Sequence, residues 1–380
     1  MTRVYLIRHG EAEGNIYRRA QGQFESALTA KGLRQVDALA ERFRGERIDA
    51  LYSSDLKRTR QTAAAVTKYH DIPMHLDPRL REVALGCWED VPFGDLQHNS
   101  PQQMVYFNND PARWSVPGSE PFDALTRRIC GAVADIAAHH DGETVAVVSH
   151  GMAIRALLAD TLGVPSEEIS RVPHGDNTCV SLLEVEGGRI TPVWYNNADH
   201  LPAALSTFAR QSWWEAPAAE DQNNVWFRRL DPKQYPQTYL AYYEKTWRAV
   251  HGDLRGFCAP LYLAAAERHA RACPDAIVTI VRPDGTAVGV TELDTERGAD
   301  EGAGWICLCF VEEAYRRRQL GVQLIGHAVS LFRRLGRSAL RLSVFSGNTG
   351  AIRFYEEYGF RRIGESDGVA GPLYLMEKEL

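Results

Sequence analysis

The sequence predicts two domains, an N-terminal, mostly parallel α/β/α sandwich and a C-terminal mixed α+β domain. Its 380 residues exceed the roughly 250 to 300 at which a single hydrophobic core stops growing. Up to about residue 195, short β-branched runs alternate with helical patterns, which is typical of a parallel sheet covered by helices. A polar, proline-containing segment then precedes a different pattern. We expect a first domain over residues 1–205, a connector over 206–224 and a second domain over 225–380.

Apolar periodicity gives the expected elements of the first domain. Strands are predicted at 4–7, 48–52 and 145–148, where short apolar runs precede helical spacing. The helical spacing is clearest over 29–43 and 152–162. The segment Ser53-Ser54-Asp55 after the second strand predicts a helix N-cap there.

The second domain begins with a predicted strand at 225–230 and helices at 237–251 and 258–272. Strands at 276–281 and 287–293 flank a turn whose Pro283-Asp284-Gly285 core favours a hairpin, since proline presets φ and glycine permits positive φ. A strand at 305–311, a helix at 321–335, a strand at 339–344, a helix at 349–358 and a terminal strand pair complete the prediction.

Composition excludes several classes of protein. No stretch approaches the ~20 apolar residues that a membrane span needs, so we expect no membrane partner. The net charge of -6, from 43 Lys and Arg against 49 Asp and Glu, argues against a dedicated nucleic-acid binder. The seven cysteines contain no paired metal or redox spacing, and we expect buried free thiols. Together with a first segment lacking a signal peptide pattern, this predicts a reducing cytoplasm.

A first chemical site is indicated by two histidines that each follow an apolar strand and precede a glycine, His9 and His150. In open α/β sheets the carboxyl ends of the strands form the ligand crevice, so the two corners can converge. Arg8 adjoins the first histidine, and Arg58 lies one turn into the helix after the second strand. Two guanidinium groups and two imidazoles suit a doubly charged phosphoryl group, without a metal.

These residues resemble those of the histidine phosphatase (phosphoglycerate mutase-like) superfamily. The matching blocks run in order from Arg8-His9-Gly10-Glu11 with Asn15, through residues 54–63 and Leu80-Arg81-Glu82, to Ser149-His150-Gly151. The resemblance implies that His9 becomes a phosphohistidine and that Glu82 is the proton donor. It implies that the phosphoryl oxygens are held by Arg8, Asn15, Arg58 and His150, and we add Gly151 and Gln21 to this candidate set.

A mutase, which passes phosphate between substrate oxygens, remains the alternative. Mutases of the family usually carry a long insertion after the acidic residue, whereas residues 83–90 resemble the short version of the phosphatase branch. We therefore expect hydrolysis of a small phosphorylated metabolite. Arg18, Arg19 and Gln21 are candidates for the mouth of the pocket, with solvated surface as the equal alternative for both arginines.

A second chemical site is indicated by the segment 310–321, in which an apolar strand, a basic loop and a helix start follow one another. Such a segment forms an anion nest suited to a pyrophosphate. Together with residues 348–360, it resembles the GCN5-related N-acetyltransferase (GNAT) family over about residues 225–380. The resemblance implies acetyl-CoA as co-substrate and a small amine or amino acid-like acceptor. The implied cofactor site comprises Phe310, Val311, Arg316, Arg317, Arg318, Gln319, Leu320, Gly321, Asn348 and Tyr355.

Tyr355 would protonate the departing thiolate, and a core tyrosine is the alternative. One residue departs from the family loop, since Gln319 stands where its first glycine is expected. If this position needs positive φ, a non-glycine residue costs on the order of 1 kcal/mol. Glu312 and Glu313 are candidates for the amine's base, with surface carboxylates as the alternative.

The predicted function is a bifunctional enzyme that hydrolyses a phosphomonoester and acetylates an amine, in a shared pathway. The alternative is a phosphatase with a CoA sensor or structural module. The sequence sets no oligomeric state.

Overall fold

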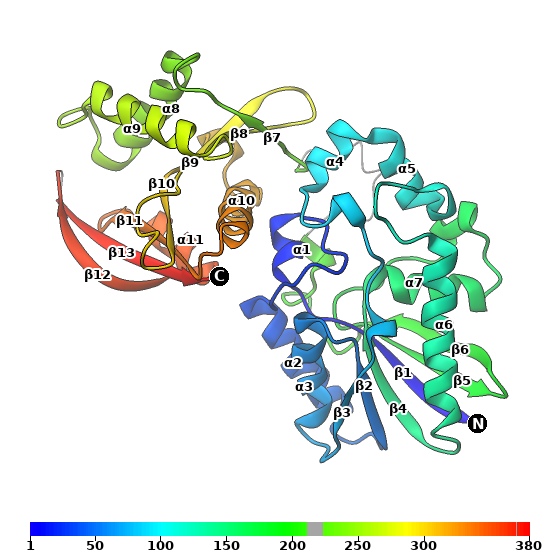
Figure 1. Ribbon diagram of the computed structural model, residues 1–380. Helices are drawn as coiled ribbons and strands as arrows, with labels where there is room; N and C mark the ends of the chain where they lie inside the picture. The colour runs from blue at the N-terminus through cyan, green and yellow to red at the C-terminus, as the bar shows by residue number, and fades with distance from the viewer. Residues whose placement is uncertain (211–222, 370) are drawn as a thin grey trace. The chain divides into compact units, whose positions relative to one another are not determined.

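The computed structural model describes residues 1–210, 223–369 and 371–380. These residues form two compact units, one mainly N-terminal and one mainly C-terminal (Figure 1). Part of the expected connector, residues 211–222, lies outside the described residues. Among the helices that the structure describes, none has both the length and the apolar character needed to cross a bilayer.

The first unit contains a six-stranded sheet of order β3-β2-β4-β1-β5-β6. Its strands are β1 (Thr2–Arg8), β2 (Ala50–Ser53), β3 (Met74–Leu76), β4 (Thr144–Ser149), β5 (Val180–Glu186) and β6 (Arg189–Asn197). Strands β3, β2, β4 and β1 pair in parallel, whereas β5 and β6 pair antiparallel at one edge. The prediction of a mostly parallel sheet is confirmed.

The helices along this part of the chain are α1 (Glu13–Tyr17), α2 (Ala30–Phe43), α3 (Lys57–Thr67), α4 (Phe93–Asn99), α5 (Pro101–Asn109), α6 (Phe122–Ala138) and α7 (Gly151–Thr161). Short 3₁₀ helices lie at Pro78–Leu80, Gly86–Trp88, Pro111–Arg113, Ser166–Arg171 and Phe208–Arg210.

Two helical layers cover this sheet because alternate residues of the central strands are buried on both faces. Tyr5 and Ile7 of β1 pack in one cluster with α2 and α3. The alternate residues Val4 and Leu6 are equally buried, and α6 and α7 contact β1. Thr29 accepts a hydrogen bond from Gly32 N at 2.9 Å and so caps α2 where the sequence predicts its start.

The second unit contains a seven-stranded sheet of order β12-β13-β11-β10-β9-β8-β7. Its strands are β7 (Trp226–Arg229), β8 (Ile277–Val281), β9 (Ala287–Asp294), β10 (Ala303–Val311), β11 (Ala339–Phe345), β12 (Arg361–Gly368) and β13 (Gly371–Glu379). Its helices are α8 (Pro236–His251), α9 (Ala259–Ala272), α10 (Leu320–Arg334) and α11 (Thr349–Glu357), with a 3₁₀ turn at Glu313–Tyr315.

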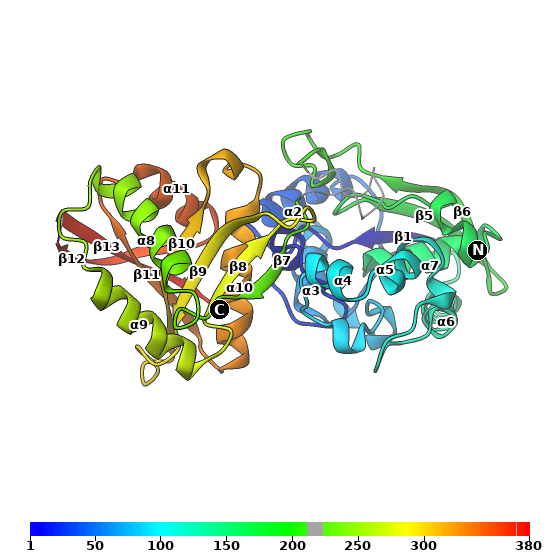
Figure 2. The ribbon, with the colours of Figure 1, turned by 90° about the horizontal axis from the view of Figure 1, so that it is seen from above.

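In this unit the sheet lies between α9 and α10, as both views show (Figures 1 and 2). The predicted hairpin between β8 and β9 is present. Gly285 has a φ of +85°, and Arg282 N donates to Thr286 O at 2.9 Å across the turn. The mixed α+β class predicted for this part is confirmed, and each helix and strand expected from the pattern appears within a few residues of its predicted bounds.

All seven cysteines are free, as expected, but the expectation that they are buried is wrong for Cys87 and Cys258. Both are exposed, since apolar periodicity does not report the position of a residue in a loop or at a helix start.

Candidate active sites

Three strand ends meet at one edge of the N-terminal sheet. In the parallel β1–β4 pair, Arg8 lies opposite Ser149, so the residues that follow, His9 and His150, are neighbours. Strand β2 lies on the other side of β4 and brings Ser54 to the same place, where its N–H donates to Val148 O at 3.0 Å. Sheet topology therefore assembles residues that are up to 141 positions apart in the sequence.

His9 is buried and held in one tautomer. Its Nδ1 lies 2.7 Å from Gly10 O, and a carbonyl oxygen only accepts hydrogen bonds, so Nδ1 carries the proton. Burial, followed by the positive charges of Arg58 and Arg8, lowers the pKa of His9 well below 6.5. At neutral pH its Nε2 therefore bears an unprotonated lone pair, as a nucleophile requires.

His150 forms the N-cap position of α7, and its ring centroid lies 5.3 Å from that of His9. Its Nε2 lies 2.9 Å from Ser54 Oγ. Burial and then the charge of Arg58 lower the pKa of His150 well below 6.5. The two histidines are thus both neutral in the free protein at pH 7.

Arg58 is fully buried, and its guanidinium is fixed by backbone oxygens. Nη1 donates to Phe24 O at 2.9 Å, and Nη2 donates to Gly22 O at 2.6 Å. Burial lowers the pKa of Arg58 to about 10, so the group stays charged at neutral pH. Arg8 is also buried, and its Nη1 donates to Gly175 O.

Three buried nitrogens at these strand ends, Arg8 Nε, Arg58 Nε and His150 Nδ1, have no hydrogen-bond partner among the described residues. Leaving a buried donor unsatisfied costs about 1–3 kcal/mol, more when the group is charged. Such groups are expected where a ligand supplies the missing acceptors. Their combined donors and positive charge suit an anion.

Glu82 lies at the start of α7. Its Oε1 accepts from Ala153 N at 2.9 Å and its Oε2 from Met152 N at 3.0 Å. These two residues follow His150 and Gly151 directly, so one helix end orients the carboxylate and the second histidine. The structure thus brings the predicted acid to the same end of the sheet as the histidines.

Arg128, on α6, fixes the backbone that carries Glu82, and sequence analysis did not single it out. Its guanidinium donates to Arg81 O at 2.9 Å and Glu82 O at 3.2 Å, and it forms an ion pair with Glu120 at 2.6 Å. The local sequence around a helical arginine cannot indicate a contact with a residue 46 positions away, as between Arg128 and Glu82.

The remaining predicted phosphate ligands differ in their contacts. A Cβ on Gly151 would lie 3.4 Å from Arg8 Nε, so glycine suits this close approach. Asn15 Oδ1 accepts from Ala12 N at 2.9 Å, and Gln21 Oε1 accepts from Ser26 Oγ at 2.6 Å. These last two bonds order the chain after the first histidine.

The alternative of a solvated surface is wrong for Arg18 and Arg19, because both are buried. Arg19 Nε donates to Asp90 Oδ1 at 2.7 Å. The predicted cap at residues 53–55 is also wrong. The N-cap of α3 is Leu56, with no side-chain hydrogen bond, and Asp55 instead accepts from Arg81 Nε at 2.6 Å.

Glu89 is a second group that sequence analysis missed. Its carboxylate accepts from Gln23 N, Phe24 N and Leu85 N, each at 2.9 Å. The loop at Gly22–Phe24 is therefore held from both sides, by Glu89 at its N–H groups and by Arg58 at its carbonyls. Burial is the largest influence on Glu89 and raises its pKa.

In the C-terminal unit, β10 and β11 pair in parallel only from Ala303 to Ile306 and from Ala339 to Leu342. Both strands continue beyond that point without pairing to each other. The basic loop follows β10, and Arg316 Nε donates to Val311 O at 3.0 Å, while the Arg316 guanidinium carbon lies 5.7 Å from the centroid of the Phe310 ring.

The loop itself has two residues in the left-handed region, Arg317 with φ of 60° and Gln319 with φ of 59°. In this chain, position 319 therefore does have positive φ, and it is occupied by glutamine. Arg316, Arg317 and Arg318 are exposed, whereas Leu320 is buried as the first residue of α10.

Gly321 leaves room for Phe354 of α11. A Cβ at position 321 would lie 3.1 Å from Phe354 Cζ. The start of α10 and the middle of α11 are thus in contact, which places the basic loop beside the helix that carries Tyr355.

Tyr355 is buried in the core of the unit, in edge-to-face contact with Phe354 and Phe360. Burial, followed by the nearby Cys309, raises the pKa of Tyr355 well above 10, so its phenol is protonated at neutral pH. Asn348 caps α11 by accepting from Ala351 N at 3.1 Å. Tyr355 is thus a core residue, and its protonated phenol could still donate a proton.

The two candidate bases lie at the other end of the basic loop. Glu312 forms an ion pair with Lys245 at 2.6 Å, and Glu313 is exposed in the 3₁₀ turn.

The chain is similar to known proteins in both parts. Residues 4–198 match the histidine phosphatase superfamily (branch 1), and residues 227–360 match the acetyltransferase (GNAT) family. Over 172 residues the chain is 38% identical to a Yersinia pestis protein named "Probable phosphoglycerate mutase GpmB", a match covering 45% of this chain and 80% of the relative. The solved structure of Bacillus stearothermophilus YhfR matches with a TM-score of 0.51 and 32% identity, covering 53% of this chain and 99% of YhfR.

The family match spans just over half of the chain, and it covers the strand ends that carry Arg8, His9 and His150. The second match covers β10, the basic loop and α11. The chain therefore belongs to the histidine phosphatase superfamily and carries a GNAT-family domain in the same polypeptide.

Proposed function

We propose that the chain is a bifunctional enzyme, which hydrolyses a small phosphomonoester through a phosphohistidine at its N-terminal site and acetylates an amine at its C-terminal site. The observation that carries the first activity is the fixed, neutral His9 between two buried guanidinium groups. The domains proposed for the two reactions are residues 1–205 and 225–380, joined by 206–224.

In the first step, Nε2 of His9 attacks the phosphorus atom and the bond from phosphorus to the ester oxygen breaks. Arg8, Arg58 and His150 stabilise the charge on the equatorial oxygens. Glu82, as the carboxylic acid, gives its proton to the leaving alkoxide. The proposed reaction draws its positive charge from Arg8 and Arg58 and calls for no metal.

In the second step, a water molecule attacks the phosphohistidine, the bond from phosphorus to nitrogen breaks, and inorganic phosphate leaves. Glu82, now a carboxylate, takes the proton of that water. Asn15, Gln21 and Gly151 complete the proposed set around the phosphoryl oxygens.

The substitution His9→Ala tests this activity. We expect phosphate release from p-nitrophenyl phosphate to fall by at least ~10³-fold, and the acid-labile phosphoenzyme formed by the wild type to disappear. Acetyl-CoA binding should not change. Retention of the phosphoenzyme in His9→Ala would overturn the assignment of the nucleophile.

Mutase activity is the alternative for this site, because the Yersinia relative carries the name of a mutase. The short segment after Glu82, which folds as a turn with the 3₁₀ helix Gly86–Trp88, favours hydrolysis. Incubation with 3-phosphoglycerate separates the two. Release of inorganic phosphate supports hydrolysis, whereas formation of the 2-phospho isomer supports the mutase.

The observed features of the C-terminal unit fit acetyl-CoA. Three exposed arginines precede a helix start, where N–H groups lack intrahelical partners, and this favours a pyrophosphate at residues Arg316–Gly321. The unpaired edge of β10 at Phe310 and Val311 suits the pantetheine amides. When bound, acetyl-CoA supplies a thioester-activated acetyl group. Tyr355 holds the proton that the thiolate takes, and Asn348 orients α11.

A CoA sensor that acetylates nothing is the alternative for this unit. Calorimetric titration of the full chain with acetyl-CoA is the first test, and no binding would refute both hypotheses. If binding occurs, a screen of small amines with Tyr355→Phe as the comparison separates them. An acetylated product that decreases in Tyr355→Phe supports the enzyme. A phosphatase rate that depends on acetyl-CoA, without acetylated product, supports the sensor.

A further inference from the structure

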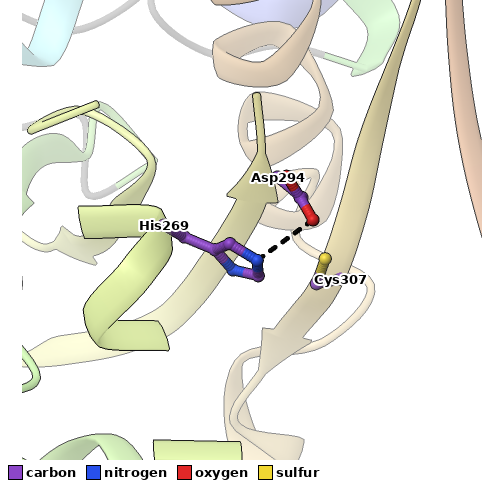
Figure 3. A group of neighbouring side chains, drawn as sticks. All are labelled: His269, Asp294 and Cys307. Atoms are coloured by element: carbon purple, nitrogen blue, oxygen red, sulfur yellow. Dashed lines mark ion pairs between the residues drawn. The ribbon is translucent and has the colours of Figure 1, made fainter. Parts of the chain in front are cut away.

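A buried cluster of potential metal ligands lies in the C-terminal unit, apart from the basic loop. His269 comes from the last turn of α9, Asp294 ends β9, and Cys307 lies on β10 (Figure 3). The imidazole points toward the carboxylate and the thiol, and the nearest ligand atoms of the three residues lie within 4.8 Å of one another. Three elements of the fold thus contribute one donor each.

A second carboxylate, that of Glu292, orients the imidazole of His269 through its Nδ1 atom. His269 Nδ1 lies 2.8 Å from Glu292 Oε1, and Tyr239 Oη donates to Glu292 Oε2 at 2.8 Å. A carboxylate accepts the Nδ1 proton in this arrangement, so the lone pair of Nε2 points toward Asp294 and Cys307. Carboxylate groups hold metal-binding histidines in this way in many metal sites.

Charged groups surround Nε2 of His269. Asp294 Oδ2 lies 3.1 Å from it. Arg268 Nη2 is 3.4 Å from the same nitrogen. His269, Glu292 and Asp294 are all buried, so solvent does not screen them effectively.

The donor set fits zinc, and so does the spacing of its nitrogen and oxygen atoms, while the Cys307 sulfur lies within 4.8 Å of both. With bonds of about 2.0–2.1 Å to nitrogen and oxygen, a tetrahedral zinc site separates these two ligands by about 3.3 Å, close to the observed 3.1 Å. We propose that His269, Asp294 and Cys307 bind a divalent transition metal ion of the zinc type, with Glu292 orienting the imidazole. Binding forms a bond to the Cys307 sulfur and releases its proton to solvent, and the three protein ligands leave a fourth position for water.

The test uses the full chain, purified without an affinity tag and dialysed against a weak chelator. Metal content by mass spectrometry should show about one zinc per chain. Replacing zinc with cobalt should give thiolate-to-cobalt charge-transfer absorption, which reports the Cys307 bond directly. A wild-type chain that takes up no zinc from a zinc-buffered solution would overturn the proposal.

Variants separate the site from adventitious binding. Cys307→Ser and Asp294→Asn should lose the zinc and the cobalt band. Cys273→Ser is the matched control, because this half-buried thiol follows the same helix α9 and should leave both signals unchanged. Arg268→Gln removes a competing positive charge and should tighten zinc binding. If Cys307→Ser keeps the cobalt band, or if Arg268→Gln weakens binding, the assigned ligands are wrong.

Discussion

The two candidate sites hold their arginines in opposite ways. Arg58 is buried and gripped by two backbone carbonyls, whereas Arg316, Arg317 and Arg318 are exposed on a loop. A buried, fixed cation can stabilise charge that develops at one atom in a transition state. Salt and water screen the charge of exposed guanidinium groups, so these groups suit the binding of a phosphate that does not react. The difference fits the proposed chemistry at phosphorus in the N-terminal unit and the proposed anchoring of a pyrophosphate in the C-terminal unit.

The largest expected effect is on the rate of phosphate release and follows from a substitution at Glu82. We expect Glu82→Gln to slow the release of phosphate from an alkyl phosphomonoester by ~10²–10⁴-fold, because the alkoxide then leaves without a proton. With p-nitrophenyl phosphate the first step should slow much less, since nitrophenolate leaves unprotonated. Steady-state and burst kinetics on both esters measure this.

The control for that experiment is Glu25→Gln, which removes an exposed carboxylate that accepts from Lys57 N. It should leave both rates near those of the wild type. An equal loss in the rate of the first step, the burst, on the two esters in Glu82→Gln would show that the carboxylate does not act on the leaving group.

Arg58→Ala should lower both activity and stability. We expect phosphatase turnover to fall by ~10²–10³-fold, and unfolding to become easier by about 1–3 kcal/mol for each carbonyl, Gly22 O and Phe24 O, left without a donor. Arg318→Ala is the matched change at an exposed arginine and should alter stability by no more than about 0.5 kcal/mol. Activity assays and urea unfolding of both variants give the contrast. A similar loss of stability in Arg58→Ala and Arg318→Ala would contradict the contrast between a buried, fixed arginine and an exposed one.

Acid should weaken the N-terminal unit before the C-terminal unit. Burial lowers the pKa values of His9, His150 and His174 well below 6.5, whereas the unfolded chain titrates near 6.5. As pH falls below 6.5, the unfolded state therefore binds protons that the folded state does not, and stability is lost. Each histidine contributes up to about 1.4 kcal/mol per pH unit over this range.

Pulse proteolysis in urea between pH 7.5 and 5, read out on peptides from each unit, measures this slope. His174→Gln should reduce the slope for the N-terminal unit and leave the C-terminal unit unchanged. A slope that does not respond to this substitution would contradict the assignment of buried, neutral histidines.

The smallest expected effect is at Gln319. Its φ of 59° is present without a ligand, so the strain, about 1 kcal/mol, already exists in the folded chain. Gln319→Gly should therefore raise stability by up to about 1 kcal/mol and leave acetyl-CoA affinity nearly unchanged. Urea unfolding measures the stability, and calorimetric titration measures the affinity for acetyl-CoA. Binding that tightens at least ~5-fold would show that the loop rearranges when CoA binds.

Sequence patterns predicted what depends on local periodicity and on sheet topology. Strand-then-histidine corners gave the pairing of His9 with His150, because neighbouring parallel strands end at the same edge. The pattern could not give Arg128 or Glu89, whose partners are backbone groups far away in the sequence. The N-cap expected within residues 53–55 was wrong for a related reason, since the Asp55 carboxylate accepts from Arg81, a residue distant in the sequence, and the N-cap is Leu56.

In the C-terminal unit, the departure at Gln319 was visible in the sequence, but its backbone conformation was not, because left-handed glutamine is uncommon. The cluster of His269, Glu292 and Asp294 was also missed. Its histidine lies on an amphipathic helix and its carboxylates on a buried strand, and only the packing of α9 against β9 brings them together.

The central position of β1 also has a consequence for how the protein is made. This strand leaves the ribosome before its two neighbours, β4 and β5, which are complete only at Ser149 and Glu186. The strand must wait for nearly the whole unit before it can pair, and contacts between such distant segments form late in folding. His9 therefore gains its fixed environment only after both neighbouring strands are complete.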